Sequence, residues 1–275
     1  MGVVFALASA SFWGTGDFAG GLSARRINEF QVLVLALISG IIIITLLAIV
    51  KGEALPNLES SVWASLAGVS GGLGIAALYR GLALGKAAVV APTAAVIGAA
   101  LPILFGLVFE GVPQSTQIAG FLAGITGIWL LARFPSGSGD DVRSGLLLAF
   151  LAGVGFGSFF ILIAQVEPDK ILTPLLVAKA VALCVALVIL FTKSLGLPPI
   201  RHSPIALLAG LLETGGSIFY LWATQFTRLD VAAVLSSMYP AATIFLAGLI
   251  VKETVSPTQW AGVALCLVAV ALIAV

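Results

Sequence analysis

The chain is a succession of long apolar stretches separated by short polar breaks. A helix that crosses the hydrocarbon core of a bilayer needs about 20 mostly apolar residues. We predict a transmembrane helix over each of ten stretches: 3–22, 31–50, 62–84, 88–109, 115–132, 145–165, 172–191, 203–226, 231–251 and 258–275. A transmembrane barrel would need alternating segments of about 10 residues, and this pattern is missing from the sequence. The predicted fold is an all-α membrane protein with ten transmembrane helices.

Amino-acid composition points the same way. Hydrophobic residues occupy 60% of the 275 positions, charged residues only 9%, and the mean hydropathy is +1.19. A soluble domain carries about 45–50% apolar and about 25% charged residues, so a soluble globular enzyme and a disordered protein are excluded. The formal net charge of +1 gives no attraction to polyanions, and no nucleic-acid partner is expected.

One stretch near the middle of the chain reads as a linker. Residues 134–141 are rich in proline, glycine and serine, and they divide the ten predicted helices five and five. We therefore delimit a first five-helix repeat at 1–134, a linker loop at 135–144 and a second five-helix repeat at 145–275.

The two halves align on a single offset (156 − 13 = 143). This offset relates residues in several regions of the chain: Trp13 and Phe156, Tyr79 and Trp222, Glu110 and Glu253. An internal duplication is therefore indicated. Because five is odd, the second repeat must enter the membrane from the opposite side, which is the inverted-repeat architecture of many secondary transporters. The alternative is a duplicated membrane scaffold that transports nothing.

Short motifs add a family resemblance. They are the stretch Phe12–Phe18, the stretch Leu78–Gly85, the matched Glu110 and Glu253, and the pairs Gln117/Gly120 and Gln259/Gly262. With the ten-helix duplicated layout, they make the whole chain resemble the EamA-type branch of the drug/metabolite transporter superfamily. The resemblance implies a 5+5 fold and a central cavity lined mainly by the first, third, fourth, sixth, eighth and ninth helices. It also implies movement, often export, of small metabolites.

Four ionisable residues lie inside predicted helices, where charges are costly and mark functional candidates: Asp17, Arg80, Lys179 and Glu213. None of the four is repeated at the offset of 143. By depth, Asp17 can pair with Arg80, and Lys179 with Glu213. Such pairs would either orient helices or form a substrate site for a zwitterionic or anionic metabolite. A carboxylate in that site is also a candidate to carry a coupling proton.

Further candidates share helix faces with these charges. Glu213, Ser217 and Tyr220 are spaced i, i+4 and i+7, and they predict one cavity-facing side of the eighth helix. Four aromatic residues would either stack on a ligand or pack between helices: Tyr79, Phe156, Trp222 and Tyr239. Trp13 shares a face with Asp17. The duplicated Glu110 and Glu253 lie at helix ends, which favours a structural or gating role.

Two short segments resemble enzyme motifs but lack the partner residues that the chemistry requires. The Gly14–Asp17 segment has the GxGD form of intramembrane aspartyl proteases, but the other aspartates lie in loops or at helix ends. A serine nucleophile needs a base, and the single histidine, His202, lies in a loop. The sequence shows no zinc-ligand cluster, Walker motif or haem pattern. We therefore predict no enzyme activity, no metal and no cofactor, and expect transport to draw on gradients or exchange.

The function predicted from sequence is secondary transport by alternating access. The expected cargo is a small polar metabolite, amino-acid-like or other, moved by export or exchange and with a proton as the candidate coupling ion. A flippase for a lipid-linked substrate and a non-transporting scaffold or sensor remain as alternatives. We expect a multi-pass protein of the cell inner (plasma) membrane, with the lipid bilayer as its other partner. The sequence leaves open the substrate and whether the protein is a monomer or a homodimer.

Orientation is also left open by the sequence. Three basic residues, Lys51, Lys170 and Arg228, lie on loops that share a side with the N-terminus, against eight on the opposite loops. By the positive-inside rule this favours termini outside the cell. The family resemblance implies termini inside.

Overall fold

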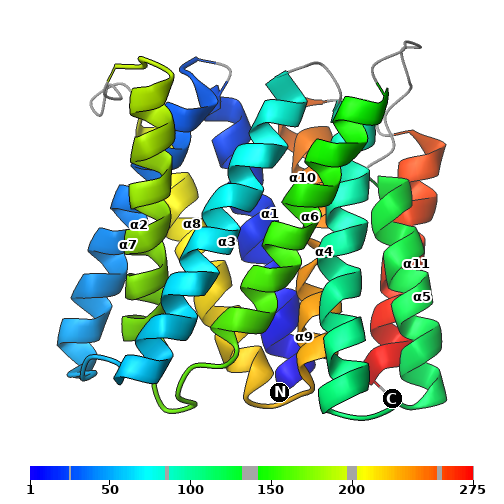
Figure 1. Ribbon diagram of the computed structural model, residues 1–275. Helices are drawn as coiled ribbons and strands as arrows, with labels where there is room; N and C mark the ends of the chain where they lie inside the picture. Colours follow the sequence, from blue (N-terminus) through cyan, green and yellow to red (C-terminus); the bar gives the residue numbers. More distant parts are fainter. Residues whose placement is uncertain (25, 84–86, 132–141, 197–202, 253–255, 275) are drawn as a thin grey trace.

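The computed structural model describes residues 1–24, 26–83, 87–131, 142–196, 203–252 and 256–274, and within these ranges every regular element is helical (Figure 1). The elements are α1 (Gly2–Ala24), α2 (Glu29–Lys51), α3 (Leu58–Ala83), α4 (Ala87–Phe109), α5 (Ser115–Leu131), α6 (Val142–Ile163), α7 (Leu172–Thr192), α8 (Pro204–Thr224), α9 (Leu229–Ser236), α10 (Tyr239–Leu246), the π-helix η2 (Ala247–Val251) and α11 (Pro257–Ala274). The predicted all-α class is confirmed.

Several of these helices meet the requirements of a membrane span by length and composition alone. Five long apolar stretches do so: Glu29–Lys51, Leu58–Leu78, Leu172–Thr192, Pro204–Thr224 and Leu229–Ile250. Four shorter apolar stretches accompany them: Ala94–Phe109, Ser115–Leu130, Leu147–Ile163 and Pro257–Ile273. Large apolar side chains such as Val50 and Leu122 are exposed on the outer surface, as expected where helices face lipid.

The two halves run in opposite directions through the bundle. In Figure 1, α1 rises from the end that carries both termini, whereas α6 starts at the other end and descends. Equivalent helices of the two halves pack on equivalent partners. The contact of α1 with α8 corresponds to that of α6 with α3, and the contact of α3 with α7 corresponds to that of α8 with α2. This reciprocal packing is what an inverted repeat requires.

The ninth predicted span, 231–251, is not the single helix that the hydropathy pattern indicates. It consists of α9, α10 and the π-helical turn η2, with a break at Ser237 and Met238. Pro240 follows the break and has no backbone N–H to continue a helical ladder. Its counterpart in the first half, α4, runs unbroken from Ala87 to Phe109. The two repeats therefore differ most where the second half borders the centre of the bundle.

Small residues set the closest helix contacts. A Cβ atom added at Gly155 of α6 would lie 2.6 Å from the Cα atom of Gly74 and 2.7 Å from the carbonyl oxygen of Ser70, both on α3. Two backbones can approach this closely in lipid only when neither bears a side chain at the crossing. This α3–α6 contact joins the halves across the centre of the molecule.

Gly155→Ala should therefore destabilise the protein by about 1–3 kcal/mol, the usual cost of overpacking. The measurement is chemical denaturation of the purified protein in detergent micelles. Gly21→Ala is the matched control, because a Cβ atom there meets nothing within 4 Å. Equal stabilities for both variants would show that the α3–α6 contact has room for a methyl group.

Candidate functional site

A cavity of about 620 Å³ lies between the two halves. Seven long helices contribute to its wall, together with the α9–α10 junction: α1, α2, α3, α4, α6, α7 and α8. The resemblance implied the first, third, fourth, sixth, eighth and ninth helices, and the structure adds α2 and α7. Because the lining reaches Ala24 at the end of α1 and Glu29 at the start of α2, the cavity extends toward the side away from the termini.

Three ionisable side chains meet on the wall of this cavity. Asp17 comes from α1, Lys179 from α7 and Glu213 from α8. The carboxyl groups of Asp17 and Glu213 are close enough to interact electrostatically, and Lys179 interacts in the same way with Glu213. No ion pair of 4 Å or less joins Lys179 and Glu213, both of which the structure describes. The cluster therefore places two carboxyl groups and one amine on the same wall.

Two glycines make room for the cluster. A Cβ atom at Gly16 of α1 would lie 3.2 Å from the Glu213 Oε1 atom, and one at Gly40 of α2 would lie 3.4 Å from the Lys179 Cδ atom. The first distance is tighter than ordinary van der Waals contact, and the second is at its lower limit. Side chains at these positions would therefore press on the charged groups.

An aromatic group, made of Trp13, Phe160 and Tyr220, lies on the termini side of the cluster. Trp13 precedes Asp17 on the rising helix α1, and its ring centroid lies 5.5 Å from that of Phe160 and 5.9 Å from that of Tyr220. The Tyr220 hydroxyl donates a hydrogen bond to the Phe160 carbonyl oxygen (2.9 Å), and Trp13 Nε1 donates to the Glu213 carbonyl oxygen (3.2 Å). Trp13 and Phe160 form the floor of the cavity, and Tyr220 packs behind them.

The structure brings together part of the set of residues predicted from sequence. Seven of them line the cavity: Trp13, Asp17, Phe156, Lys179, Glu213, Ser217 and Tyr239. Tyr220 is fully buried behind the wall, and Trp222 packs instead on Phe5 and Phe219. The lining also includes Phe159, Phe160 and Ser237, which sequence reasoning did not select because they read as ordinary packing residues.

One predicted pairing falls partly outside the described structure. The backbones of Tyr79 and Arg80 belong to α3, but their side chains are outside the described part of the structure. The Asp17–Arg80 pair therefore stays a prediction. The partner that the structure gives to Asp17 is Glu213, on the helix that packs most extensively against α1.

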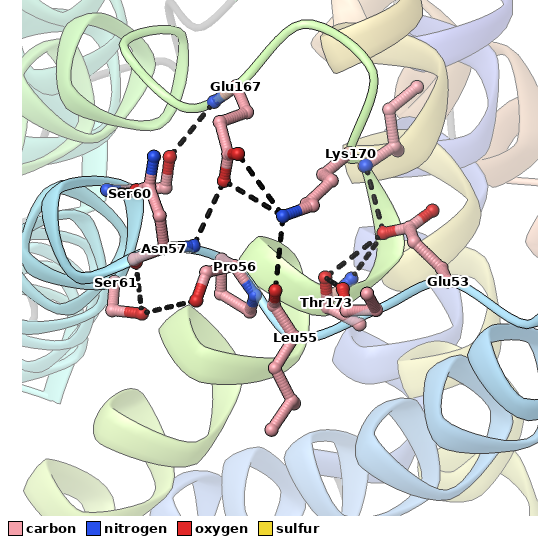
Figure 2. A network of polar contacts seen from close by, with 11 residues as sticks. Glu53, Leu55, Pro56, Asn57, Ser60, Ser61, Glu167, Lys170 and Thr173 are labelled. Atoms are coloured by element: carbon pink, nitrogen blue, oxygen red, sulfur yellow. Dashed lines mark hydrogen bonds and ion pairs between the residues drawn. The ribbon is translucent and has the colours of Figure 1, made fainter.

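On the termini side, polar contacts join the two halves beyond the aromatic floor (Figure 2). The Glu53 carboxylate follows α2 and accepts hydrogen bonds from the backbone N–H groups of Ile171, Leu172 and Thr173 (2.7–3.1 Å) at the start of α7. These N–H groups have no partner within their own helix, and the positive end of the helix dipole favours an anion there. Burial opposes ionisation, but the Thr173 N–H and Lys51 outweigh it, so the pKa of Glu53 lies below its usual value.

The same connections carry a second set of contacts, drawn in Figure 2. The Glu167 carboxylate accepts a hydrogen bond from the backbone N–H of Asn57 (3.0 Å), and the Glu167 backbone N–H donates to the Ser60 hydroxyl (3.1 Å). Lys170 pairs with Glu167 (3.1 Å) and donates to the Leu55 carbonyl oxygen (3.1 Å). The α2–α3 connection is thereby attached to the α6–α7 connection of the other half.

A third cross-half contact lies at the end of α4. The Glu110 carboxylate accepts a hydrogen bond from the Leu229 N–H (3.1 Å) at the start of α9, and Arg228 donates to the Gly111 carbonyl oxygen (2.8 Å). Arg228 also pairs with the Asp230 carboxylate (2.8 Å), whose side chain is 0% exposed. Burial and the neighbouring Asp230 raise the pKa of Glu110, while the Leu229 N–H and Arg228 oppose the shift. Glu253, its sequence partner, is outside the described residues.

We call these three sets of contacts the termini-side closure. The offset of 143 places Gly196 opposite Glu53, Ile27 opposite Lys170, and Gly85 opposite Arg228. The ionic contacts are therefore not repeated by the corresponding residues at the other end of the molecule. A second, smaller cavity of about 300 Å³ lies next to this closure, lined in part by Glu110, Gln165 and Thr224.

Apolar helices in two inverted halves, packed around a charged cavity, define a membrane protein of the transporter class. Comparison of the sequence with known families agrees: the profile of the EamA-like transporter family matches residues 1–133 and again residues 143–275. The chain belongs to this family, in line with the drug/metabolite transporter superfamily, and it is a multi-pass membrane protein. Proteins of this family are generally not enzymes.

Two further comparisons describe relatives. An uncharacterized protein of Methanocaldococcus jannaschii is 29% identical over 135 residues, which cover 48% of this chain and 93% of that protein. That relative therefore has about the length of one repeat. A solved crystal structure superposes with a TM-score of 0.78 over 98% of this chain and 95% of the other, at 19% identity. At that identity the likeness establishes a shared fold.

Arg228→Ala should lower the free energy of unfolding by about 3 kcal/mol, because it leaves the buried Asp230 carboxylate without its partner. Denaturation in detergent micelles measures the loss. Adding Asp230→Asn to Arg228→Ala should recover part of it, since the unpaired charge is then removed. Arg26→Ala, at an exposed position, is the control. No recovery in the double variant would show that Arg228 stabilises through its backbone contacts alone.

The stabilisation that the Glu53 carboxylate provides should be lost in acid. A carboxylate with a lowered pKa stabilises the folded state above its ordinary value of 4.5, and this stabilisation is lost as the pH falls through the folded-state value. Wild-type protein should therefore lose stability below about pH 4.5 more steeply than Glu53→Gln, as followed by thermal unfolding across pH. Parallel profiles would exclude Glu53 as the acid-sensitive contact. Glu59→Gln, at an exposed position, controls for general charge effects.

Proposed function

We propose that the protein is a secondary transporter of the inner (plasma) membrane that moves a small zwitterionic metabolite, such as an amino acid, by alternating access. The observation that carries this proposal is the Asp17–Glu213–Lys179 cluster on the wall of a cavity between two inverted halves. Charges inside a membrane are expensive unless they serve a pathway or a site. A site with both charge signs fits a cargo with both an ammonium and a carboxylate group.

The described conformation corresponds to one end of a transport cycle. Its cavity extends toward the side away from the termini, while the aromatic floor and the termini-side closure separate the cluster from the other side. To release cargo on the termini side, the contacts of Glu53, Glu110 and Arg228 across the halves must break. The break between α9 and α10 lies at the cavity wall, where Ser237 and Tyr239 line it, and it is a natural hinge for that movement.

The two neighbouring carboxyl groups also offer a means of coupling to protons. Two carboxylates side by side in apolar surroundings repel each other, so the empty site favours a proton on one of them. A bound ammonium group would satisfy both carboxylates as ions, and the proton would leave to solvent. Cargo and proton would then compete for one site, so that each drives the other in the opposite direction.

Removal of this pair provides the test. Purified protein is screened by thermal unfolding against the standard L-amino acids, since a ligand of the folded state raises stability by about 2.7 kcal/mol at a hundred times its dissociation constant. For the amino acid that stabilises most, binding in weak buffer at neutral pH should release up to one proton. Glu213→Gln should abolish that release and weaken binding at least tenfold.

Glu59→Gln is again the control and should behave as wild type. Proton release that persists in both Glu213→Gln and Asp17→Asn would contradict coupling at this pair. Transport in proteoliposomes that ignores an imposed pH gradient would contradict it as well. If no amino acid alters unfolding at any concentration, the proposed zwitterionic cargo is wrong.

A further inference from the structure

At equivalent positions of α1 and α6, one helix supplies polar groups to the cavity and the other supplies aromatic rings. At the offset of 143, Gly16 corresponds to Phe159 and Asp17 to Phe160. All four residues line the cavity, although α1 and α6 are equivalent helices of the two halves. Where one repeat brings a carboxylate next to a glycine, the other brings two phenyl rings. The cavity is therefore polar on one wall and aromatic on the other.

The other two charged side chains come from the second repeat, and their counterparts in the first repeat are uncharged. Lys179 corresponds to Ala36, which lines the cavity, and Glu213 corresponds to Ser70. The polar wall thus consists of α1, α7 and α8. The opposite wall is made by α6 with the small residues of α3 and α4.

Glycines on α3 and α4 leave space beside the rings of α6. A Cβ atom at Gly74 would lie 3.2 Å from the Cδ1 atom of Phe156, and one at Gly71 would lie 3.2 Å from the Cδ2 atom of Phe159. Both phenylalanine side chains are only half-buried. Both rings also line the cavity, so this wall offers an apolar surface to an occupant.

We infer that the cargo is amphipathic: its charged head binds at Asp17, Lys179 and Glu213, and its apolar body lies against Phe156 and Phe159. This inference rests on the proposed function and narrows its substrate class to zwitterions with an apolar or aromatic side chain. A hydroxylated body such as that of a sugar would lose its hydrogen bonds to water against the α6 wall without replacement. Flat apolar groups gain there, because aromatic rings stack favourably on one another.

The test is a homologous series on the full-length protein in nanodiscs. Dissociation constants are measured by calorimetry for glycine, L-alanine, L-norvaline, L-norleucine and L-phenylalanine, with L-serine and L-threonine as hydroxylated probes. Affinity should rise about fourfold for each buried methylene group. L-phenylalanine should bind at least tenfold tighter than L-alanine, and L-threonine more weakly than L-norvaline.

Variants locate the effect on the α6 wall. Phe156→Ala should weaken L-phenylalanine binding at least tenfold and change L-alanine binding less than threefold. Trp222→Ala is the matched control, because this aromatic residue packs on Phe5 and Phe219 instead of lining the cavity. Phe156→Leu, which preserves most of the volume, guards against a misfolded alanine variant and should give an intermediate loss for L-phenylalanine.

The outcomes separate this inference from the function on which it rests. If all zwitterions bind with similar affinity, or if L-serine and L-threonine bind tightest, the zwitterion site stands and the amphipathic cargo is wrong. The inference is also wrong if Phe156→Ala weakens L-alanine and L-phenylalanine binding by the same factor. If wild-type protein binds no member of the series, both the inference and the proposed zwitterionic cargo fail.

Discussion

The cost of placing a charge inside a membrane governs this structure more than any other interaction. A charged residue at the centre of a membrane helix is unfavourable by about 2.5–3.5 kcal/mol on insertion scales, so Asp17, Lys179 and Glu213 cannot each face lipid. They come together on one cavity wall from α1, α7 and α8. Gly16 and Gly40 leave the space that the cluster needs. The three charged residues therefore require that α1, α7 and α8 border the cavity and do not lie wholly in lipid.

The internal duplication accounts for the helix arrangement, whereas the polar residues differ between the two repeats. The helix contacts of the two halves correspond to each other, as an inverted repeat requires. The polar residues break that equivalence twice. The charges of the cavity belong to one wall, and the ionic contacts of Glu53, Lys170 and Arg228 belong to one end. The two ends of the molecule therefore differ in their ionic contacts, although the helices that form them are equivalent.

The fold could be predicted from sequence because its signals are local. Apolar runs of about 20 residues and one offset of 143 indicate the membrane helices and the inverted halves. Hydropathy alone does not show the helix break at Ser237, since it averages over a proline. Glu213 could not be selected as the partner of Asp17, because depth along a helix does not say that α1 packs on α8. Glu53 and Glu167 lie in breaks between predicted helices, and only the structure shows the backbone N–H groups that they bind.

The central claim is that this protein exposes one charged cavity to the two sides of the membrane in turn. The test places single cysteines in a Cys184→Ser, Cys266→Ala background. One replaces Ala36, which lines the main cavity, and the other replaces Thr224, which lines the cavity next to the termini-side closure. Each is probed with a membrane-impermeant thiol reagent applied from one side of sealed vesicles. We expect Ala36→Cys to react only from the side away from the termini in the resting protein. Removing the closure with Glu53→Gln and Arg228→Ala should lower this reactivity. The same two substitutions should raise the reactivity of Thr224→Cys from the termini side. Reaction of Ala36→Cys from both sides at once, or no change on removing the closure, would contradict the central claim.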